Sequence, residues 1–181
     1  TAANRVTYES ISKLISSGKY LREATVGRPD LEEHMANYEA GDYRGFILGG
    51  DTGIGKSTLF ARYVEERQAK EDVVLFYRAS ALVSTDLSAR ILRDMGAKNM
   101  FLEDLLSFLD DLFKEQETCR FRVVIDAVNE HPKDVAEFVR TIDQIVVQAE
   151  SYPWFRLVAS VRNSAYERLP SDARFAASDG A

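Results

Sequence analysis

Short runs of apolar residues alternate along the chain with longer stretches in which apolar residues recur every three or four positions. The short runs predict buried strands at 44–48, 73–77, 121–126 and 154–160. The longer stretches predict helices at 5–17, 29–40, 57–70, 85–95, 101–117 and 133–150. Strands that alternate with helices indicate an α/β fold, in which a parallel sheet has helices on both faces. A short fifth strand at 173–177 would extend one edge.

A glycine-rich segment connects the first predicted strand to the helix that follows it. The segment fits the phosphate-binding pattern G-x-x-x-x-G-K-[ST], and strand, loop and helix is the context that this pattern requires. Its backbone N–H groups and the helix N-terminus would bind a polyphosphate, whereas the alternative is a glycine-rich turn without a ligand. The predicted nucleotide-binding residues are Gly50, Asp51, Thr52, Gly53, Ile54, Gly55, Lys56, Ser57 and Thr58.

Within this loop, Lys56 is expected to contact the β- and γ-phosphates and Ser57 to bind Mg²⁺. A second metal ligand is predicted at Asp126, which ends the apolar run 121–126 in a Walker B pattern. Asp126 would lie at the carboxyl edge of the sheet beside the loop, where open α/β sheets bind ligands. An aspartate in a turn after a strand is the alternative.

Two further side chains are candidates for catalysis. Glu130 is close enough to Asp126 to poise an attacking water, although a solvated loop carboxylate is the alternative. Asn129 could orient the same water or cap the turn. Arg162 follows the fourth predicted strand; if that strand lies between the first and third, Arg162 would face the γ-phosphate. The alternative is that the Arg162 guanidinium is simply exposed to solvent at the end of the strand.

The composition narrows the class of protein. The chain has 181 residues, 45% hydrophobic and 29% charged, which suits one globular domain. A net charge of −6 argues against a large nucleic-acid surface, although a local basic patch is the alternative. The single Cys119 excludes an internal disulfide and is consistent with a cytoplasmic location. No apolar run approaches a membrane span. The start at Thr1 and the polar end lead us to expect a module of a longer polypeptide.

Together these motifs resemble the STAND class of P-loop ATPases, and within it the NACHT-type modules. The Walker A loop has an acidic residue after its first glycine, and the Walker B strand is followed by a small residue with the acid displaced to Glu130. The stretch 158–162 is similar to the sensor 1 strand with its arginine. Gly27 and Arg28 resemble the Gly-Arg motif that contacts the adenine side.

The resemblance implies a three-layer core of the ASCE type with strand order 2-3-4-1. It also implies ATP or ADP with Mg²⁺ as cofactors, Ser57 and Asp126 as metal ligands, and Lys56, Asp126, Glu130 and Arg162 as catalytic residues. Residues 1–28 would be a helix and linker, 29–170 the NTPase domain and 171–181 a tail. Asn129 stands where many members of the class carry an aspartate, so the resemblance implies slow hydrolysis that depends on Glu130. Pro29 stands where an acidic residue is common beside the adenine contact.

This class of protein acts as a switch in innate immunity and antiviral defence. The nucleotide state would control opening and homo-oligomerisation of the full-length protein in response to a trigger ligand or protein. Two alternatives stay open from the sequence. One is a small P-loop kinase or other phosphotransferase. The other is a scaffold that binds nucleotide without cleaving it, for which Asn129 is the best argument.

Overall fold

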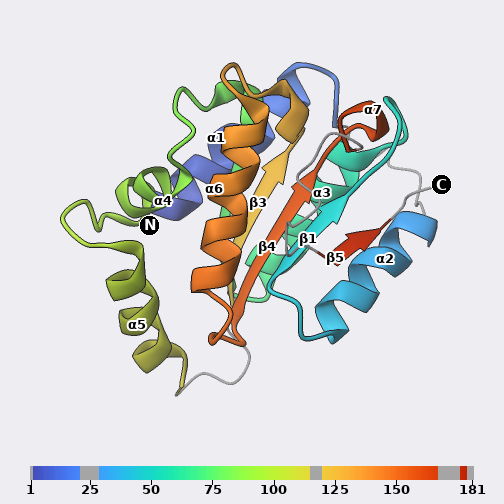
Figure 1. The fold of residues 1–181 in the computed structure, drawn as a ribbon. Helices are drawn as coiled ribbons and strands as arrows, with labels where there is room; N and C mark the ends of the chain where they lie inside the picture. The colour runs from blue at the N-terminus through green and yellow to red at the C-terminus, as the bar shows by residue number, and fades with distance from the viewer. Residues whose placement is uncertain (1, 21–28, 115–119, 167–175, 179–181) are drawn as a thin grey trace.

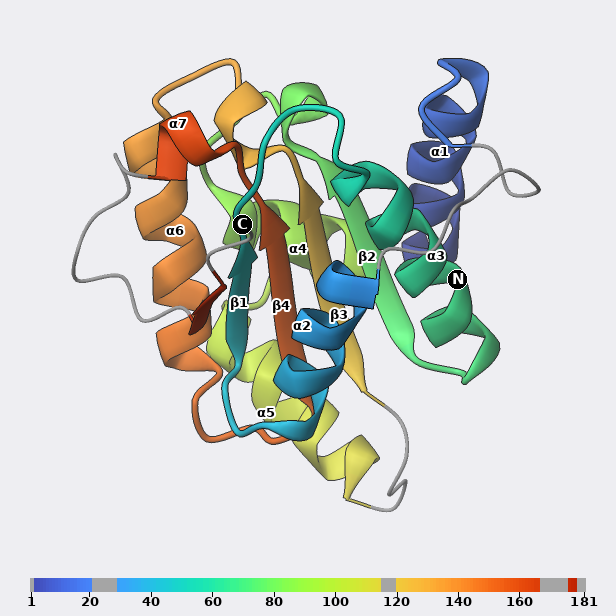
Figure 2. The ribbon, with the colours of Figure 1, turned by 90° about the vertical axis from the view of Figure 1, so that its right-hand side faces the viewer.

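A parallel sheet with helices on both faces forms the molecule (Figures 1 and 2). The computed structural model describes residues 2–20, 29–114, 120–166 and 176–178. The strands are β1 (Gly45–Leu48), β2 (Val73–Arg78), β3 (Phe121–Asp126), β4 (Phe155–Ser160) and β5 (Ala176–Ser178). Their order is β2-β3-β4-β1-β5, and every pair is parallel. The predicted order 2-3-4-1 is therefore confirmed, and β5 adds the expected edge strand.

The helices divide between the two faces of the sheet. They are α1 (Ala2–Ser16), α2 (Pro29–Ala40), α3 (Lys56–Ala69), α4 (Leu87–Met95), α5 (Leu102–Phe113), α6 (Val135–Gln148) and α7 (Asn163–Tyr166), with 3₁₀ turns η2 (Ala79–Ala81) and η3 (Val128–Glu130). Helices α4, α5 and α6 pack in one hydrophobic cluster, and α2 and α3 in another. No helix in the described part of the chain has the length and apolar character needed to cross a membrane.

Capping aspartates set the first residues of α4 and α6, which the spacing of apolar residues in the sequence did not define. The predicted helix 85–95 begins at Leu87 because the Asp86 carboxylate accepts from Ala89 N–H at 2.9 Å. The predicted helix 133–150 begins two residues later because Asp134 accepts from Glu137 N–H at 3.1 Å. An Asx side chain that binds a free N–H of the first turn stabilises the helix start. The described part of the predicted helix 101–117 is α5, and residues 115–119 lie outside the description.

Helix α1 lies beside β2, the strand at one edge of the sheet (Figure 2). Thr7 Oγ1 donates to Val74 O at 2.7 Å and accepts from Phe76 N–H at 3.2 Å, and Ser10 Oγ donates to Phe76 O at 2.6 Å. Ala3 and Val6 join one hydrophobic cluster, whereas Ile11 and Leu14 join the other. The helix thus satisfies backbone groups that an edge strand would otherwise leave unpaired, and it belongs to the packed core.

A buried ionic cluster joins helices and strands at the end of the sheet opposite the glycine-rich loop. Arg122 Nε donates to Asp72 at 2.5 Å, and Arg122 Nη1 donates to Glu39 on α2 and to Tyr63 on α3. Tyr63 also donates to Glu39. Burial opposes ionisation of Glu39, but the Arg122 charge and these hydrogen bonds outweigh it, so the pKa of Glu39 is lowered. A buried charge that lost its partner would be costly.

Candidate nucleotide-binding site

The glycine-rich loop between β1 and α3 contains glycines with positive φ angles, among them Gly50 and Gly55. Gly50 has φ +153°, and a Cβ there would lie 2.3 Å from Ile54 Cδ1. Gly55, the N-cap of α3, has φ +99° in the left-handed region. Other residues reach such conformations at a cost of about 1 kcal/mol or more. The sequence therefore folds into a tight loop that ends at a helix N-terminus, as the pattern predicts.

Lys56, the first residue of α3, folds back over this loop. Its Nζ donates to Gly50 O at 2.5 Å and to Asp51 O at 2.8 Å. Partial burial lowers the pKa of Lys56, and attraction to Asp126 and Asp51 opposes that shift. Negative charge brought close to the ammonium would compensate for the lost solvation.

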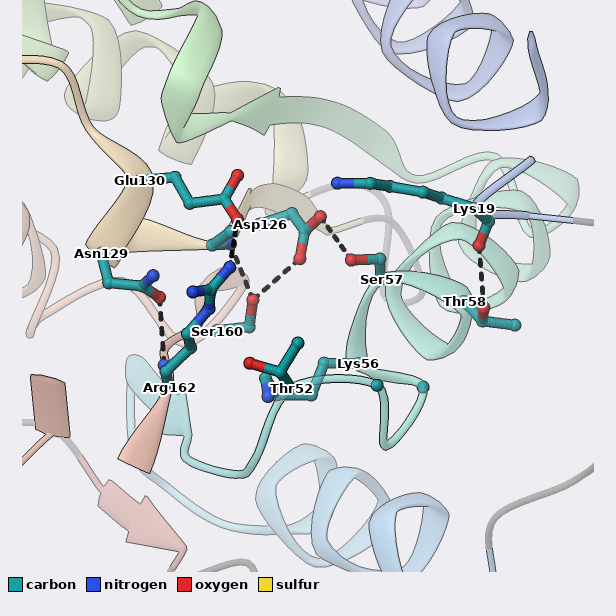
Figure 3. Close-up of a pocket in the computed structure, with 13 residues that line it drawn as sticks. Lys19, Thr52, Lys56, Ser57, Thr58, Asp126, Asn129, Glu130, Ser160 and Arg162 are labelled. Carbon is teal, nitrogen blue, oxygen red and sulfur yellow. Dashed lines mark hydrogen bonds and ion pairs between the residues drawn. The ribbon is translucent and has the colours of Figure 1, made fainter. Parts of the chain in front are cut away.

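Ser57 and Asp126, the two predicted metal ligands, are in direct contact (Figure 3). Ser57 Oγ donates to Asp126 Oδ2 at 2.7 Å, and Ser160 Oγ donates to Asp126 Oδ1 at 2.8 Å. Ser160 also accepts from Ala127 N–H at 2.8 Å and is fully buried. Because β4 lies between β1 and β3, the end of β4 brings Ser160 beneath the carboxylate. Ser160 was not predicted, although a polar residue that ends an apolar strand was the available signal.

This oxygen pair fits Mg²⁺. The ion prefers hard oxygen ligands, and proteins commonly hold it with one or two side chains while phosphates and water complete the shell. No group of three or more His, Cys, Asp or Glu residues that could hold a metal occurs in the described ranges. Ser57 and Asp126 therefore suit an ion that is shared with a bound polyphosphate.

The turn after β3 brings Glu130 and Arg162 together. Ala127 has φ +57°, and this left-handed residue redirects the chain into η3. Arg162 Nη2 donates to Glu130 Oε1 at 2.9 Å, and the Arg162 backbone N–H donates to Asn129 Oδ1 at 3.0 Å. The predicted base and the predicted γ-phosphate contact thus form an ion pair at the rim of the site (Figure 3).

His131 anchors this turn from beneath. The imidazole is buried and stacks on Phe138 with 4.2 Å between ring centroids. Its Nδ1 accepts from Lys133 N–H at 3.2 Å, so Nε2 carries the proton and donates to Ser84 O at 3.2 Å. The histidine, for which the sequence suggested no function, therefore ties η3 to the connection before α4.

A cavity of about 330 Å³ is lined by the Ser57–Asp126 pair and by the Glu130–Arg162 ion pair. Of the predicted loop residues, Gly50, Asp51 and Ile54 do not line it; the first two accept from Lys56 through their carbonyls. Gly27 and Arg28 lie outside the described residues. Lys19 and Ala127 line the cavity and were not predicted. The lining residues are Lys19, Thr52, Gly53, Gly55, Lys56, Ser57, Thr58, Asp126, Ala127, Asn129, Glu130, Ser160 and Arg162.

Fold and site together define a P-loop ATPase domain. Residues 42–166 match the family model described as "AAA domain", and the chain belongs to this family. P-loop ATPases of this type generally bind ATP or ADP with Mg²⁺ and hydrolyse ATP. The NACHT-type subclass within STAND stays a prediction. No curated protein matches the chain significantly.

Chains with the same fold occur in solved structures of Drosophila ORC complexes. One structure, bound to AT-rich DNA and Cdc6, has 15% identity and a TM-score of 0.54 over 96% of this chain and 57% of that chain. A second, with GC-rich DNA and Cdc6, has 13% identity and a TM-score of 0.53 over 95% and 57%. A third, bound to DNA, has 14% identity and a TM-score of 0.51 over 98% and 92%. The chain thus spans just over half the length of the first two matched chains.

Proposed function

We propose that this domain is an ATP-binding and slowly hydrolysing switch module of a cytoplasmic signalling or defence protein of the STAND class. The observation that carries the nucleotide assignment is the 2.7 Å contact between Ser57 Oγ and Asp126 Oδ2 at the end of a glycine-rich loop. The contact supports the assignment because the two residues expected to bind Mg²⁺ lie side by side near the N-terminus of α3. A bound Mg²⁺ would neutralise charge on the terminal phosphates.

The ion pair at the rim supports a switch. Arg162 holds Glu130, and a γ-phosphate placed between them would compete for the guanidinium. ATP would then free Glu130 to accept a proton from an attacking water, whereas ADP would leave the pair intact. Asn129 carries an amide, and its oxygen accepts from the Arg162 N–H, so it does not serve as a second acid. Glu130 is then the candidate base of this turn, which fits slow turnover.

The opening and homo-oligomerisation expected of such a switch would take place in the full-length protein in response to an unidentified trigger. The local change that starts this transition would be the breaking of the Glu130–Arg162 ion pair when ATP replaces ADP. Sedimentation velocity of the longest available polypeptide with ADP and with a non-hydrolysable ATP analogue tests this step. An ATP-dependent increase in mass is expected, and identical profiles would contradict it.

The nucleotide assignment itself is tested by Lys56→Ala. Loss of one charge-assisted contact to the β- and γ-phosphates should cost about 2–3 kcal/mol, or roughly 30- to 150-fold in affinity for ATP. Titration calorimetry with Mg²⁺ and ATP measures this loss. Lys70→Ala, which removes an exposed lysine at the other end of the same helix, is the control. Unchanged affinity of the Lys56 variant would refute the assignment.

Glu130→Gln separates the switch from the two alternatives of the sequence analysis. Phosphate release should fall at least about 100-fold while ATP still binds, because a general base contributes about 10²–10⁴-fold. Glu33→Gln on α2 is the exposed control. If wild type and Glu130→Gln both bind ATP without turnover, the domain is a scaffold. Multiple-turnover transfer of phosphate to a small acceptor would establish a phosphotransferase.

A DNA-binding assembly is a second candidate function. The similar Drosophila ORC structures contain DNA, and two of them contain Cdc6, although the likeness extends to the fold alone. The net charge of −6 weighs against it, because phosphate contacts need basic side chains. Fluorescence anisotropy with labelled AT-rich and GC-rich duplexes, with and without ATP, distinguishes the DNA-binding function from the switch function. Salt-sensitive binding that requires ATP would favour the DNA-binding function.

A further inference from the structure

The end of helix α1 delivers one residue to the nucleotide cavity. Gly18 has φ +68°, its N–H donates to Ile15 O at 3.0 Å, and Lys19 N–H donates to Leu14 O at 3.0 Å. This pair of bonds is a Schellman motif, which stops a helix and fixes the direction of the residue that follows. The backbone at Lys19 is therefore set by the helix end.

Two contacts with α3 hold the same segment beside the glycine-rich loop. Thr58 Oγ1, in the first turn of α3, donates to Lys19 O at 3.2 Å. Tyr20 is buried, and its hydroxyl donates to Glu65 Oε2 on α3 at 2.6 Å. The position of residue 19 is thus fixed from three sides, by α1, Thr58 and the Tyr20 anchor.

The Lys19 side chain extends from this position over the cavity. It lines the cavity together with Ser57, Thr58 and Asp126. Figure 3 shows the chain of methylene groups crossing above Ser57, with the ammonium directed toward the Asp126 side. A lysine held at its backbone but extended at its tip can place a point charge on a ligand.

The lining charges distinguish Lys19 from the other cations of the cavity. Lys56 donates to two loop carbonyls, and Arg162 is paired with Glu130. Within the described residues, the Lys19 ammonium has neither a hydrogen bond nor an ion pair, although it lines the same cavity. A cation in a cleft with low-dielectric walls raises the local concentration of anions. A polyphosphate would give this ammonium a partner that the described part of the chain does not supply.

We infer that Lys19 is a further nucleotide-binding residue, whose ammonium binds a phosphate oxygen of ATP or ADP. This inference rests on the proposed nucleotide function of the cavity. The contact would hold the C-terminal end of α1 against the nucleotide, and α1 in turn covers the β2 edge through Thr7 and Ser10. Nucleotide binding would thereby stabilise the position of α1, in addition to the contact of Thr58 with Lys19 O.

The test measures the binding of Mg²⁺–ATP and Mg²⁺–ADP by titration calorimetry at low salt. It compares the variants Lys19→Gln, Lys19→Arg, Lys13→Gln and Lys56→Ala. Lys19→Gln should raise the Kd for both nucleotides about tenfold, since a partly exposed charge-assisted contact is removed. Lys19→Arg should recover most of the affinity, because it keeps the charge. Lys13→Gln removes an exposed lysine of the same helix outside the cavity and should leave both Kd values unchanged. The loss at Lys19 should shrink as salt is added.

Each outcome decides the inference. A rise of threefold or more for Lys19→Gln relative to Lys13→Gln, recovered by arginine, supports it. A smaller rise for both nucleotides, or a loss that arginine does not recover, overturns it. Thermal unfolding without nucleotide checks that the variants fold alike. Lys56→Ala distinguishes failure of the nucleotide site from failure of the Lys19 inference. If Lys56→Ala binds nucleotide normally, the nucleotide site itself is wrong. If Lys56→Ala binds weakly and Lys19→Gln binds normally, only the role of Lys19 is rejected.

Discussion

Arg162 Nη2 donates to Glu130 Oε1 at 2.9 Å, and the two residues come from segments that follow different strands of the sheet. Arg162 follows β4, whereas Glu130 ends the turn after β3. The parallel pairing of β3 with β4 brings both side chains to the same rim. Both side chains are partly exposed, so the pair contributes little to stability, and its geometry matters for ligand binding more than for folding.

Arg162→Ala should separate ATP binding from ADP binding. Loss of a charge-assisted contact to the γ-phosphate is expected to weaken ATP about 10- to 100-fold and to leave ADP within about twofold. Calorimetric Kd values for the two nucleotides measure the ratio. Arg140→Ala, which removes an exposed arginine of α6, is the matched control. Equal weakening of both nucleotides would show that Arg162 does not read the γ-phosphate.

Ser160→Ala should affect both folding and the metal site. Ser160 is fully buried and holds Asp126 Oδ1 and Ala127 N–H, so its loss leaves two polar groups without a partner. We expect a cost of about 1–3 kcal/mol in the free energy of unfolding, together with a higher Mg²⁺ concentration for half-maximal ATP turnover.

Urea unfolding and a Mg²⁺ titration of the ATPase rate measure these two effects of Ser160→Ala. Ser164→Ala, at an exposed position of α7, is the control and should change neither. Normal stability of Ser160→Ala would mean that water replaces the hydroxyl. A normal Mg²⁺ requirement would show that the orientation of Asp126 does not depend on it.

The ionic cluster around Arg122 predicts how stability depends on pH. The pKa of Glu39 is lowered, and a carboxylate with a lowered folded pKa stabilises the fold fully above its unfolded pKa, about 4.3. That contribution is lost as the pH falls below this value toward the folded pKa. The free energy of unfolding should therefore decrease between about pH 5 and pH 3, and Glu39→Gln should show a smaller decrease.

Urea unfolding at several pH values measures the dependence for wild type, Glu39→Gln and Glu33→Gln. Glu33 is exposed on the same helix, so its variant should follow the wild type. If Glu39→Gln keeps the full pH dependence, other carboxylates account for it.

Much of the sheet could be predicted from the sequence because its signals are local. Apolar runs located β1 to β4, and the glycine-rich pattern together with the aspartate that ends β3 indicated which strand ends carry the candidate site. The predicted fold class and strand order are confirmed by the pairing of the strands. The short fifth strand was expected at 173–177; the described residues 176–178 form β5, and residues 173–175 lie outside the description.

The missed features depend on contacts between distant parts of the chain. Ser160 acts through Asp126, 34 residues away, and Lys19 reaches the cavity only because Thr58 and the end of α1 hold it there. His131 is buried because Phe138 and Ser84 meet around it. None of these residues has a local pattern that distinguishes it from an ordinary polar residue in a strand end, a helix end or a loop.

Helix α1 should be required for the stability of the sheet, and Thr7→Val tests this. Valine keeps the shape of the buried threonine but removes its hydrogen bonds with Val74 O and Phe76 N–H, leaving two edge groups unpaired. The expected cost is about 2 kcal/mol or more in the free energy of unfolding. Thr141→Val, which removes a helix-surface hydroxyl that donates to Glu137 O, should cost less than about 0.5 kcal/mol. Urea unfolding of the two variants measures the difference. Equal stabilities would mean that α1 can leave the β2 edge without loss to the fold, and that residues 1–28 precede the core as a separate element.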